Sequence, residues 1–398
     1  MKVLQICLKP PVPEMDGGCK AMNNITLGLL SNNVDVKVIT ISTPKHPFKK
    51  KEISNKYIAQ TAIEDTYIDT SVNAISAFLN LFSSRSYNVE RFYSKAFEKL
   101  ITTTIQKDHF DVILLESLYV TGYVKTIREH TNAKIVYRAH NVESEIWYRN
   151  AEQEKGLKKS YFQLLAKRIK KYEQQLLNRV DAIAAITEKD KKEFLQLGCK
   201  MPMEVFPFGI DSKNYVIESN ISKHTVCHIG SMDWKPNQFG INWFLTNVWN
   251  DVIEKFPEAK LNLAGKNMPR ELLEHKQKNV NIVGEVADAN QFINQNEIMV
   301  VPLFSGSGMR IKIIEGMALQ KLVIATQIAA EGISYTDKQN IVIANTKEEF
   351  TDSILLYLNN IEQQKQIAEN ARELIRTHYD NQLIVNNLVR FFNQIKHT

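Results

Sequence analysis

Short apolar runs alternate with longer stretches of helical spacing along most of the chain. At the start, Lys2–Leu8 predicts a strand, Ala21–Leu30 has the spacing of a helix, and Val34–Ile41 predicts a second strand. Strand, helix and strand in this order are typical of a doubly wound α/β fold with a parallel sheet. We therefore expect a Rossmann-like domain at the beginning of the chain.

The same alternation continues to about residue 208, with a less regular part at residues 44–100. Further strands are predicted at 111–115, 134–137, 182–187 and 204–208, and helices at 71–82, 91–105, 119–130, 155–177 and 188–197. The polar stretch 217–223 has no periodicity, and we expect a linker near 212–223.

After this linker the α/β alternation starts again. Strands are predicted at 225–229, 260–264, 280–283, 298–303, 322–325 and 341–343, and helices at 237–252, 270–275, 289–294, 309–319, 347–359, 361–376 and 382–395. Two such runs predict two Rossmann-like domains with a ligand site in the cleft between them. A chain of 398 residues is long enough for two domains, or three.

Composition narrows the class of protein. Hydrophobic residues make up 44% and charged residues 24%, which is ordinary for a soluble globular protein. The net charge of +6 is compatible with a phosphorylated ligand or an anionic membrane, but it is too small to indicate nucleic acid. Four scattered cysteines without a C-x-x-C pair, no signal peptide and no long apolar run favour a cytoplasmic protein without a structural metal.

The stretch from Val300 to Leu319 contains the clearest candidate chemistry. A buried strand is followed by Gly306 and Gly308 and then by a helix. A helix N-terminus presents free N–H groups and a partial positive charge, which favour a phosphate. Arg310 and Lys312 add two cations there, where cations are unfavourable unless an anion lies between them. An anion site is therefore one interpretation, and a plain strand–helix turn is the other.

Three further features allow two interpretations each. Glu315 can bond the hydroxyls of a ligand or simply pair with Lys312 on the surface. Gly17 and Gly18, at a helix entry, can admit a substrate or form a tight turn. His140 follows a predicted strand at the edge where ligands gather in open α/β sheets, or it only caps a loop.

The predicted helix at 155–177 is strongly basic in its first part, residues 155–171, and carries apolar residues at helical spacing. Such a helix can lie on an anionic membrane surface, which would make the protein peripheral to the membrane. It can equally be a solvated face whose apolar side packs into the core.

Together, four segments resemble the retaining sugar-nucleotide glycosyltransferases of family 4. The segments are Gly17-Gly18, His140-Asn141-Val142-Glu143, the loop 230–237 with sequence GSMDWKPN, and the stretch 306–315 with sequence GSGMRIKIIE. The resemblance covers nearly the whole chain. It implies the α/β GT-B fold, in which two Rossmann-like domains with parallel sheets face a central cleft and the C-terminal helix crosses back to the first domain.

The resemblance also implies a division of roles. Residues 1–211 would form the acceptor-side domain, with 380–398 packed back on it, and 224–376 would bind the donor. Gly17 and Gly18 would lie on the acceptor side, and His140, Lys235 and Arg310 would be catalytic. The donor would be bound by Gly230, Lys235, Gly306, Ser307, Gly308, Met309, Arg310, Lys312 and Glu315.

Two positions depart from the family pattern. Ser307 stands where many members have the first glutamate of Glu-x(7)-Glu, which puts the identity of the donor sugar in doubt. Ser231 stands where many have an arginine, and Arg310 with Lys312 could supply that charge from the other side of the diphosphate. No Asp-x-Asp occurs in the chain. The expected reaction therefore uses a nucleotide-sugar donor and a glycan or lipid-linked acceptor, without a cofactor, a metal or a protein nucleophile, in the making of cell-surface polysaccharide or glycoconjugate.

Two other functions stay open at this point. A sugar-nucleotide epimerase of the same fold would need acid–base carboxylates near the sugar, for which Glu116, Glu143 and Glu145 are candidates. A non-catalytic membrane- or anion-binding scaffold would leave Arg310 and Lys312 without a partner.

Overall fold

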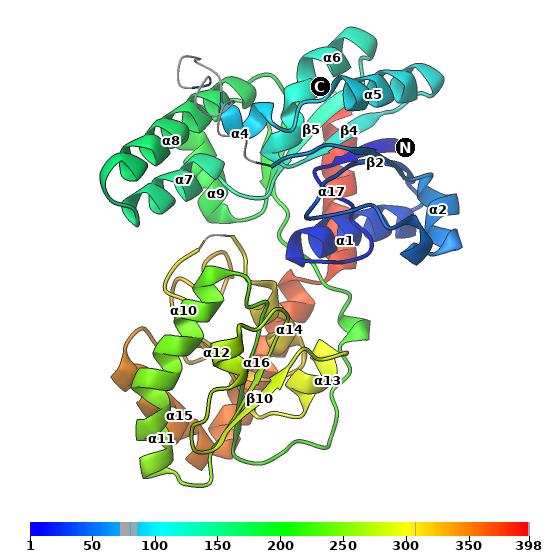
Figure 1. Cartoon of the computed structure of the whole chain (residues 1–398). Helices are drawn as coiled ribbons and strands as arrows, with labels where there is room; N and C mark the ends of the chain where they lie inside the picture. The colour runs from blue at the N-terminus through cyan, green and yellow to red at the C-terminus, as the bar shows by residue number, and fades with distance from the viewer. Residues whose placement is uncertain (72–79, 81–85, 307, 397–398) are drawn as a thin grey trace. The chain divides into compact units, whose positions relative to one another are not determined.

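The computed structural model describes residues 1–71, 80, 86–306 and 308–396. The chain forms two compact units, one of residues 1–209 with 381–398 and the other of residues 210–380 (Figure 1). Residues 212–223, predicted to be a linker, are therefore counted with the second unit. No described helix is long and apolar enough to cross a membrane.

A seven-stranded parallel sheet forms the centre of the first unit. Its strand order is β3-β2-β1-β4-β5-β6-β7, so the order reverses between β1 and β4. Val3 of β1 lies between Val36 of β2 and Val112 of β4. The strands are β1 (Lys2–Cys7), β2 (Asp35–Ser42), β3 (Glu64–Tyr67), β4 (Val112–Glu116), β5 (Lys134–Ala139), β6 (Ala182–Ala185) and β7 (Met203–Val205).

Helices cover this sheet. They are α1 (Gly17–Ser31), η1 (Lys50–Glu52), α2 (Asn55–Thr61), α4 (Tyr87–Glu90), α5 (Lys95–Lys107), η2 (Leu118–Tyr123), α6 (Val124–His130), α7 (Glu143–Glu152), α8 (Gly156–Leu176), α9 (Glu188–Gln196) and α17 (Asn381–Lys396). The sequence did not predict α2, α7 or β3, and the predicted helix at 71–82 falls mostly outside the described residues.

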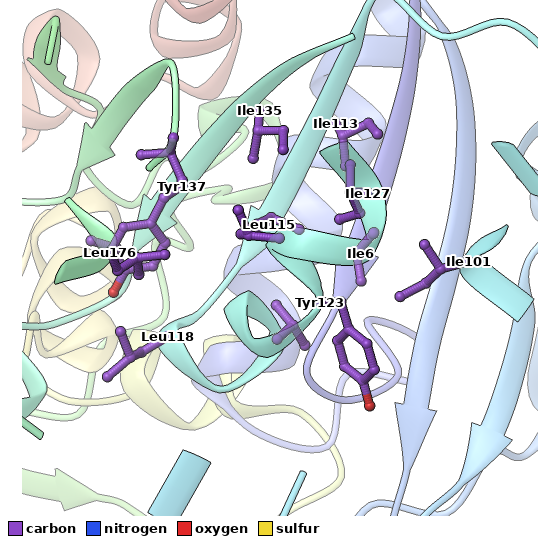
Figure 2. Close-up of a cluster of buried hydrophobic side chains, with 14 of the residues drawn as sticks. Ile6, Ile101, Ile113, Leu115, Leu118, Tyr123, Ile127, Ile135, Tyr137 and Leu176 are labelled. Carbon is purple, nitrogen blue, oxygen red and sulfur yellow. The ribbon is translucent and has the colours of Figure 1, made fainter. Parts of the chain in front are cut away.

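The core of the first unit lies on both faces of the sheet. Successive residues of a strand point to opposite faces. In β4, Ile113 and Leu115 accordingly join the cluster beside α5, α6 and α8, whereas Val112 and Leu114 join the cluster beside α1 and α17. Figure 2 shows the first cluster, in which side chains from strands and helices converge. A parallel sheet covered on both faces has near-continuous apolar strands, and this explains why its strands could be predicted.

The C-terminal helix α17 packs on the first unit, as the predicted fold class requires, and Figure 1 shows it beside α1. Gly28 of α1 allows this close approach, since a Cβ at that position would lie 2.4 Å from Cγ2 of Val385. The apolar stripe of α17 is buried, with Ile384, Val385, Leu388, Phe391, Phe392 and Ile395 all in the core.

The second unit has a six-stranded parallel sheet in the order β10-β9-β8-β11-β12-β13, so its order reverses between β8 and β11. The strands are β8 (Thr225–Ile229), β9 (Lys260–Ala264), β10 (Val280–Gly284), β11 (Ile298–Val301), β12 (Leu322–Ala325) and β13 (Val342–Ile343). Both sheets thus follow the Rossmann order, and the predicted fold class is confirmed.

The helices of the second unit are η3 (Ser212–Asn214), α10 (Lys235–Phe244), the π-helical turn η4 (Leu245–Trp249), α11 (Asn250–Lys255), α12 (Arg270–Leu273), α13 (Ala289–Asn294), α14 (Ile311–Ala318), α15 (Lys347–Asn359) and α16 (Ile361–His378). The single helix predicted at 237–252 is therefore interrupted by a π turn. The core of the second unit includes Trp249, Phe244 and Phe350, which are fully buried.

Candidate functional site

In the second unit, the two glycine loops follow the neighbouring strands β8 and β11, where the strand order reverses. Ligands of open α/β sheets bind at the carboxyl ends of strands at such a point. Gly230 comes directly after β8, and Gly306 and Gly308 lie between β11 and α14. Arg310 is the N-cap residue of α14, so the predicted strand, glycine turn and helix are formed.

Lys312 reaches from the first turn of α14 to the loop after β8. Its Nζ lies 3.0 Å from Oδ1 of Asn237 and 3.4 Å from Nε2 of His228. Burial, and then the charge of Arg310, lower the pKa of Lys312 to about 7, although Glu315 acts in the opposite direction. Among the described residues no carboxylate forms an ion pair with this ammonium group, so its bonded partners are neutral.

Two glycines, one after β8 and one after β9, leave the space that the ammonium group of Lys312 and the backbone of Gly230 occupy. A Cβ on Gly230 would be 2.3 Å from Nζ of Lys312, and a Cβ on Gly265 would be 1.8 Å from the carbonyl oxygen of Gly230. Neither separation is sterically possible without movement. The ammonium group of Lys312 therefore lies directly against the backbone of Gly230.

Arg310 is buried, with 6% of its surface exposed, and it is held from two sides. Its Nη1 donates to the carbonyl oxygen of Gly308, and its guanidinium group lies 5.2 Å from the ring centre of Trp234. A cation over an indole face is attracted by the ring quadrupole. Gly306 has a φ of +108°, and a Cβ there would be 2.8 Å from both Arg310 and Trp234. The glycine turn thus fits around the arginine.

The remaining predicted donor residues are less enclosed. Lys235 is the first residue of α10 and is exposed, with Nζ 3.5 Å from Oε1 of Gln238. Glu315 accepts a hydrogen bond from the hydroxyl of Tyr215 at 3.2 Å and is not bonded to Lys312, so the predicted surface pair is not formed. Met309 is half-buried, and Ser307 lies outside the described residues.

In the first unit, His140 belongs to a buried network at the end of β5. Its Nε2 lies 2.7 Å from Oε2 of Glu116, which also accepts from Nη1 of Arg138 at 3.0 Å. Gln5 donates to the other oxygen at 2.9 Å. Burial alone would raise the pKa of Glu116, but Arg138 and His140 outweigh it and lower that pKa. Burial lowers the pKa of His140, so a neutral ring donates through Nε2 and leaves Nδ1 as an acceptor.

The glycine pair of the first unit begins α1. Asp16 caps this helix by accepting from the backbone N–H of Cys19 at 2.9 Å, and its carboxylate also contacts Nζ of Lys9 and Nε2 of His46, at 2.6 and 2.8 Å. Asp16, Cys19 and His46 could offer three metal ligands within 4.8 Å of one another. The ammonium group of Lys9, however, already lies against that carboxylate.

The carboxylates considered for an epimerase have partners of their own. Glu143 accepts from the hydroxyl of Tyr119 at 2.7 Å, and burial raises its pKa to about 7. Glu145 lies 3.3 Å from Arg149 and 3.7 Å from Lys189.

The basic helix predicted at 155–177 corresponds to α8. Its residues Leu165, Ala166 and Ile169 are buried, and Lys167, Lys170 and Lys171 are exposed.

Sequence reasoning missed five polar residues that the structure brings to these places, which are Gln5, Lys9, Asp16, His46 and His228, and it included Asn237 only as the last residue of the loop 230–237. Asp16 was within reach as a helix cap before Gly17. Lys9 is only seven residues from its partner Asp16. Gln5, His46 and His228 had no local signal, because the residues that they contact here, Glu116, Asp16 and Lys312, are 30 or more residues away.

Two family models match the chain in succession. The model described as Glycosyltransferase Family 4 matches residues 17–214, and the model described as Glycosyl transferases group 1 matches residues 223–360. Together they cover most of the chain.

A curated relative, an uncharacterized 44.6 kDa protein in the cps region of Klebsiella pneumoniae, is 25% identical over 293 residues, which are 71% of this chain and 74% of the relative. HepE of Anabaena in complex with UDP has a TM-score of 0.71 at 15% identity and covers 99% of this chain and 100% of its own. Sucrose-phosphate synthase of Thermosynechococcus elongatus has a TM-score of 0.73 at 13% identity, with 99% of both chains covered. At such identities the solved structures establish the fold alone.

Proposed function

The chain is a glycosyltransferase of the GT-B fold, and we propose that it transfers a sugar from a nucleoside-diphosphate sugar to a hydroxyl acceptor with retention of anomeric configuration. One observation carries this proposal. Lys312 is held against the backbone of Gly230 by neutral partners, at the switch point of the second sheet and beside the N-terminus of α14. A cation held in this way is a site for an external anion.

A diphosphate leaving group fits this site chemically. When the bond between the sugar and the diphosphate breaks, negative charge grows on the leaving oxygen. Lys312, Arg310 and the N–H groups at the start of α14 are in place before the reaction, so they stabilise that charge without reorganisation. Lys235, at the start of α10, adds a mobile positive charge beside the same loop. These protein cations support a reaction that needs no metal.

His140 is proposed to orient the donor sugar. Glu116 fixes the ring through Nε2, so Nδ1 can accept a hydrogen bond from a sugar hydroxyl. Gly17 and Gly18 would lie on the acceptor side at the start of α1, where Nζ of Lys9 is 2.8 Å from the place that a Cβ on Gly18 would take. With the leaving phosphate taking the proton of the acceptor, no protein nucleophile is required.

The donor and the pathway rest on the relatives. Structures similar to this one bind UDP, UDP and glucose, or UDP-glucose, so a uridine diphosphate sugar is the first donor to test. The relative in a cps region supports a role in the biosynthesis of cell-surface polysaccharide or glycoconjugate, with a glycan or lipid-linked acceptor. The exposed lysines of α8 would hold this cytoplasmic enzyme at an anionic membrane surface.

The test is a panel of UDP-, GDP- and ADP-sugars in thermal-shift and transfer assays, with the anomeric configuration of the product read by NMR. We expect one nucleotide to raise the melting temperature, transfer to survive excess EDTA, and the anomeric configuration to be retained. Inversion, or activity that EDTA abolishes and Mg²⁺ restores, would contradict the proposal. A new nucleotide sugar formed without acceptor would indicate an epimerase instead.

Single substitutions test the roles of the cations. Arg310→Ala should lower turnover about a hundredfold or more, because one preorganised charge at a growing anion contributes about 3 kcal/mol. Lys235→Ala should lower it less, since this side chain is exposed and unrestrained. Lys276→Ala, an exposed lysine near the amino end of β10, is the matched control and should leave turnover unchanged.

A further inference from the structure

His228 is a buried residue with no role in the reaction described so far. It is the fourth residue of β8 and has no exposed surface. β8 pairs with β11 through Val226 and Cys227, and the backbone pairing ends at these residues. There, Nδ1 of His228 lies 2.8 Å from the carbonyl oxygen of Val300 in β11. The histidine therefore bridges the two strands at the switch point of the sheet.

This hydrogen bond fixes the tautomer of the ring. A carbonyl oxygen can only accept, so Nδ1 must carry the hydrogen. Burial, and then the charge of Lys312, lower the pKa of His228 well below its usual value, so the ring is neutral. In a neutral ring with hydrogen on Nδ1, Nε2 is an acceptor.

The acceptor nitrogen faces the ammonium group of Lys312 at 3.4 Å. A second acceptor, Oδ1 of Asn237, lies 3.0 Å from the same ammonium group. The amide of Asn237 cannot be reversed at no cost, because its Nδ2 donates to the carbonyl oxygen of Ser231 at 2.7 Å. Two of the three N–H groups of Lys312 are therefore directed to neutral acceptors, and within residues 86–306 and 308–396 the third has no acceptor and can bond a ligand.

We propose that His228 is a positioning residue for the donor diphosphate, which holds the ammonium group of Lys312 above Gly230 by accepting a hydrogen bond through Nε2. This inference rests on the proposed function and adds the residue that prepares its anion site. A long lysine side chain otherwise has many rotamers, and fixing it before the ligand arrives removes that entropic cost from binding. A neutral acceptor fixes the cation without neutralising it, as a carboxylate would.

The two ring nitrogens can be separated by substitution. His228→Asn places a polar group near Nδ1 and keeps the contact with Val300, but it has nothing at Nε2. His228→Gln places an amide oxygen near Nε2 and loses the contact with Val300. If His228 acts through Lys312, the asparagine variant should bind nucleoside diphosphate about tenfold more weakly, as expected for one lost hydrogen bond to a charged group, and the glutamine variant should bind close to wild type.

The experiment is isothermal titration calorimetry of the full chain with UDP, GDP and ADP, with melting temperatures as the check of folding. The same substitutions are repeated in a Lys312→Met background. There the effect of His228→Asn should vanish, because the group it positions is gone. Three outcomes would overturn the inference. The asparagine variant could bind nucleoside diphosphate as tightly as wild type, or the glutamine variant could bind it more weakly than the asparagine variant. His228→Asn could also weaken binding as much in the Lys312→Met background as in the wild type.

Proton uptake gives a second readout that does not depend on a His228 variant being stable. Burial and Arg310 hold the pKa of Lys312 near 7 in the free protein, against the opposing effect of Glu315, and a bound diphosphate must raise it. Titrations at pH 8 in buffers of different ionisation enthalpy should therefore show protons taken up on binding. Lys312→Met should abolish this uptake.

The matched control is Lys321→Met. Lys321 is also buried, with a pKa lowered to about 8, but its Nζ donates to the carbonyl oxygen of Asn294. It directly precedes β12 and so lies at the amino ends of the strands, whereas Lys312 lies at their carboxyl ends. The Lys321→Met variant should still take up protons when nucleoside diphosphate binds. Loss of this proton uptake in Lys321→Met, with uptake kept in Lys312→Met, would overturn the inference. If no nucleoside diphosphate binds the wild type, the proposed function falls as well. If a nucleoside diphosphate binds but the effects of substituting His228 and Lys312 are additive, only the proposed role of His228 is contradicted.

Discussion

The two units have the same order of strands around the switch point, but the buried charged group at that point has charged partners in the first unit and neutral partners in the second. In the first unit, the buried carboxylate of Glu116 accepts from Arg138 and His140, so the charges are balanced within the protein. In the second unit, Lys312 is bonded to neutral acceptors. The same sheet order therefore carries a carboxylate with charged partners in one unit and a lysine with neutral partners in the other, so the side chains and not the fold decide how the charge is compensated.

The units also differ in how the chain builds them. The second unit is one continuous stretch, residues 210–380, whereas the first needs residues 381–398 to return to it. In the first unit burial raises the pKa values of Glu143 and Glu173, although the pKa of Glu116 is lowered by Arg138 and His140. In the second unit burial lowers the pKa values of Lys312 and His228. The stability of the two units should therefore respond differently to deletion of the C-terminal helix, to removal of a buried charge and to a change of pH.

The largest effect is expected from deleting residues 381–398. This removes six buried apolar side chains at about 1.5–3 kcal/mol each, which together match the whole stability of an ordinary domain. The first unit should unfold and transfer should be lost, while a fragment of residues 210–380 should melt cooperatively and still bind nucleoside diphosphate. Calorimetry of both proteins checks this.

Point substitutions in α17 serve as a control for the deletion. Leu388→Ala, at a fully buried position, should cost about 2–5 kcal/mol, and Leu383→Ala, at a position 49% exposed, should cost little. A truncated protein with wild-type melting temperature and activity would contradict the account of α17.

The next largest effect concerns the closed network of the first unit. Glu116→Gln keeps the shape but leaves the buried guanidinium group of Arg138 without its counter-charge, so we expect a loss of about 3–5 kcal/mol in denaturant unfolding. Lys312→Met is the comparison, because it removes a charge that has no such partner and should not destabilise the protein. Equal losses in the two variants would remove the distinction between the units.

A smaller effect is the pH dependence of stability from Lys312. Its pKa is about 7 when folded and near 10.5 when unfolded, so between these values the unfolded chain binds more protons and stability rises with pH. Lys312→Met removes this term. The melting temperature of the variant relative to wild type should therefore be highest at pH 6.5 and fall toward pH 9.5, and a constant difference would contradict the prediction.

The smallest effect per residue is expected from Glu143 and Glu173, and it has the opposite sign. Burial raises both pKa values to about 7, so the stability from their protonated forms is full below about pH 4.5 and is lost as pH rises through 7. The double variant Glu143→Gln, Glu173→Gln should match wild type at pH 5 and gain stability at pH 8. The gain should be at most about 3 kcal/mol per residue, because each pKa lies about 2.5 units (7 − 4.5) above its ordinary value and one unit corresponds to about 1.4 kcal/mol. A gain that is larger at pH 5 would contradict this.

Much of the fold could be predicted because both sheets are covered on both faces. Burial on two sides makes strands such as β4 and β11 continuous apolar runs, and it gives α17 one apolar stripe at helical spacing. The failures were elements without such a signal. β3, with the sequence EDTY, is a polar edge strand, and the π turn η4 lies inside an unbroken helical pattern.

For the site, the sequence by itself determined the local parts: the glycine loops, the start of α14, and the two cations placed where a helix N-terminus disfavours them. The tertiary structure alone decided which charges are compensated. His228 and Lys312 are 84 residues apart, and Glu116 and His140 are 24 apart, and only the strand order brings each pair together. In the tertiary structure Lys235 is exposed, whereas Lys312 is enclosed by residues from other elements. The pKa of a group depends on burial and on its neighbours in space, and local sequence spacing fixes neither.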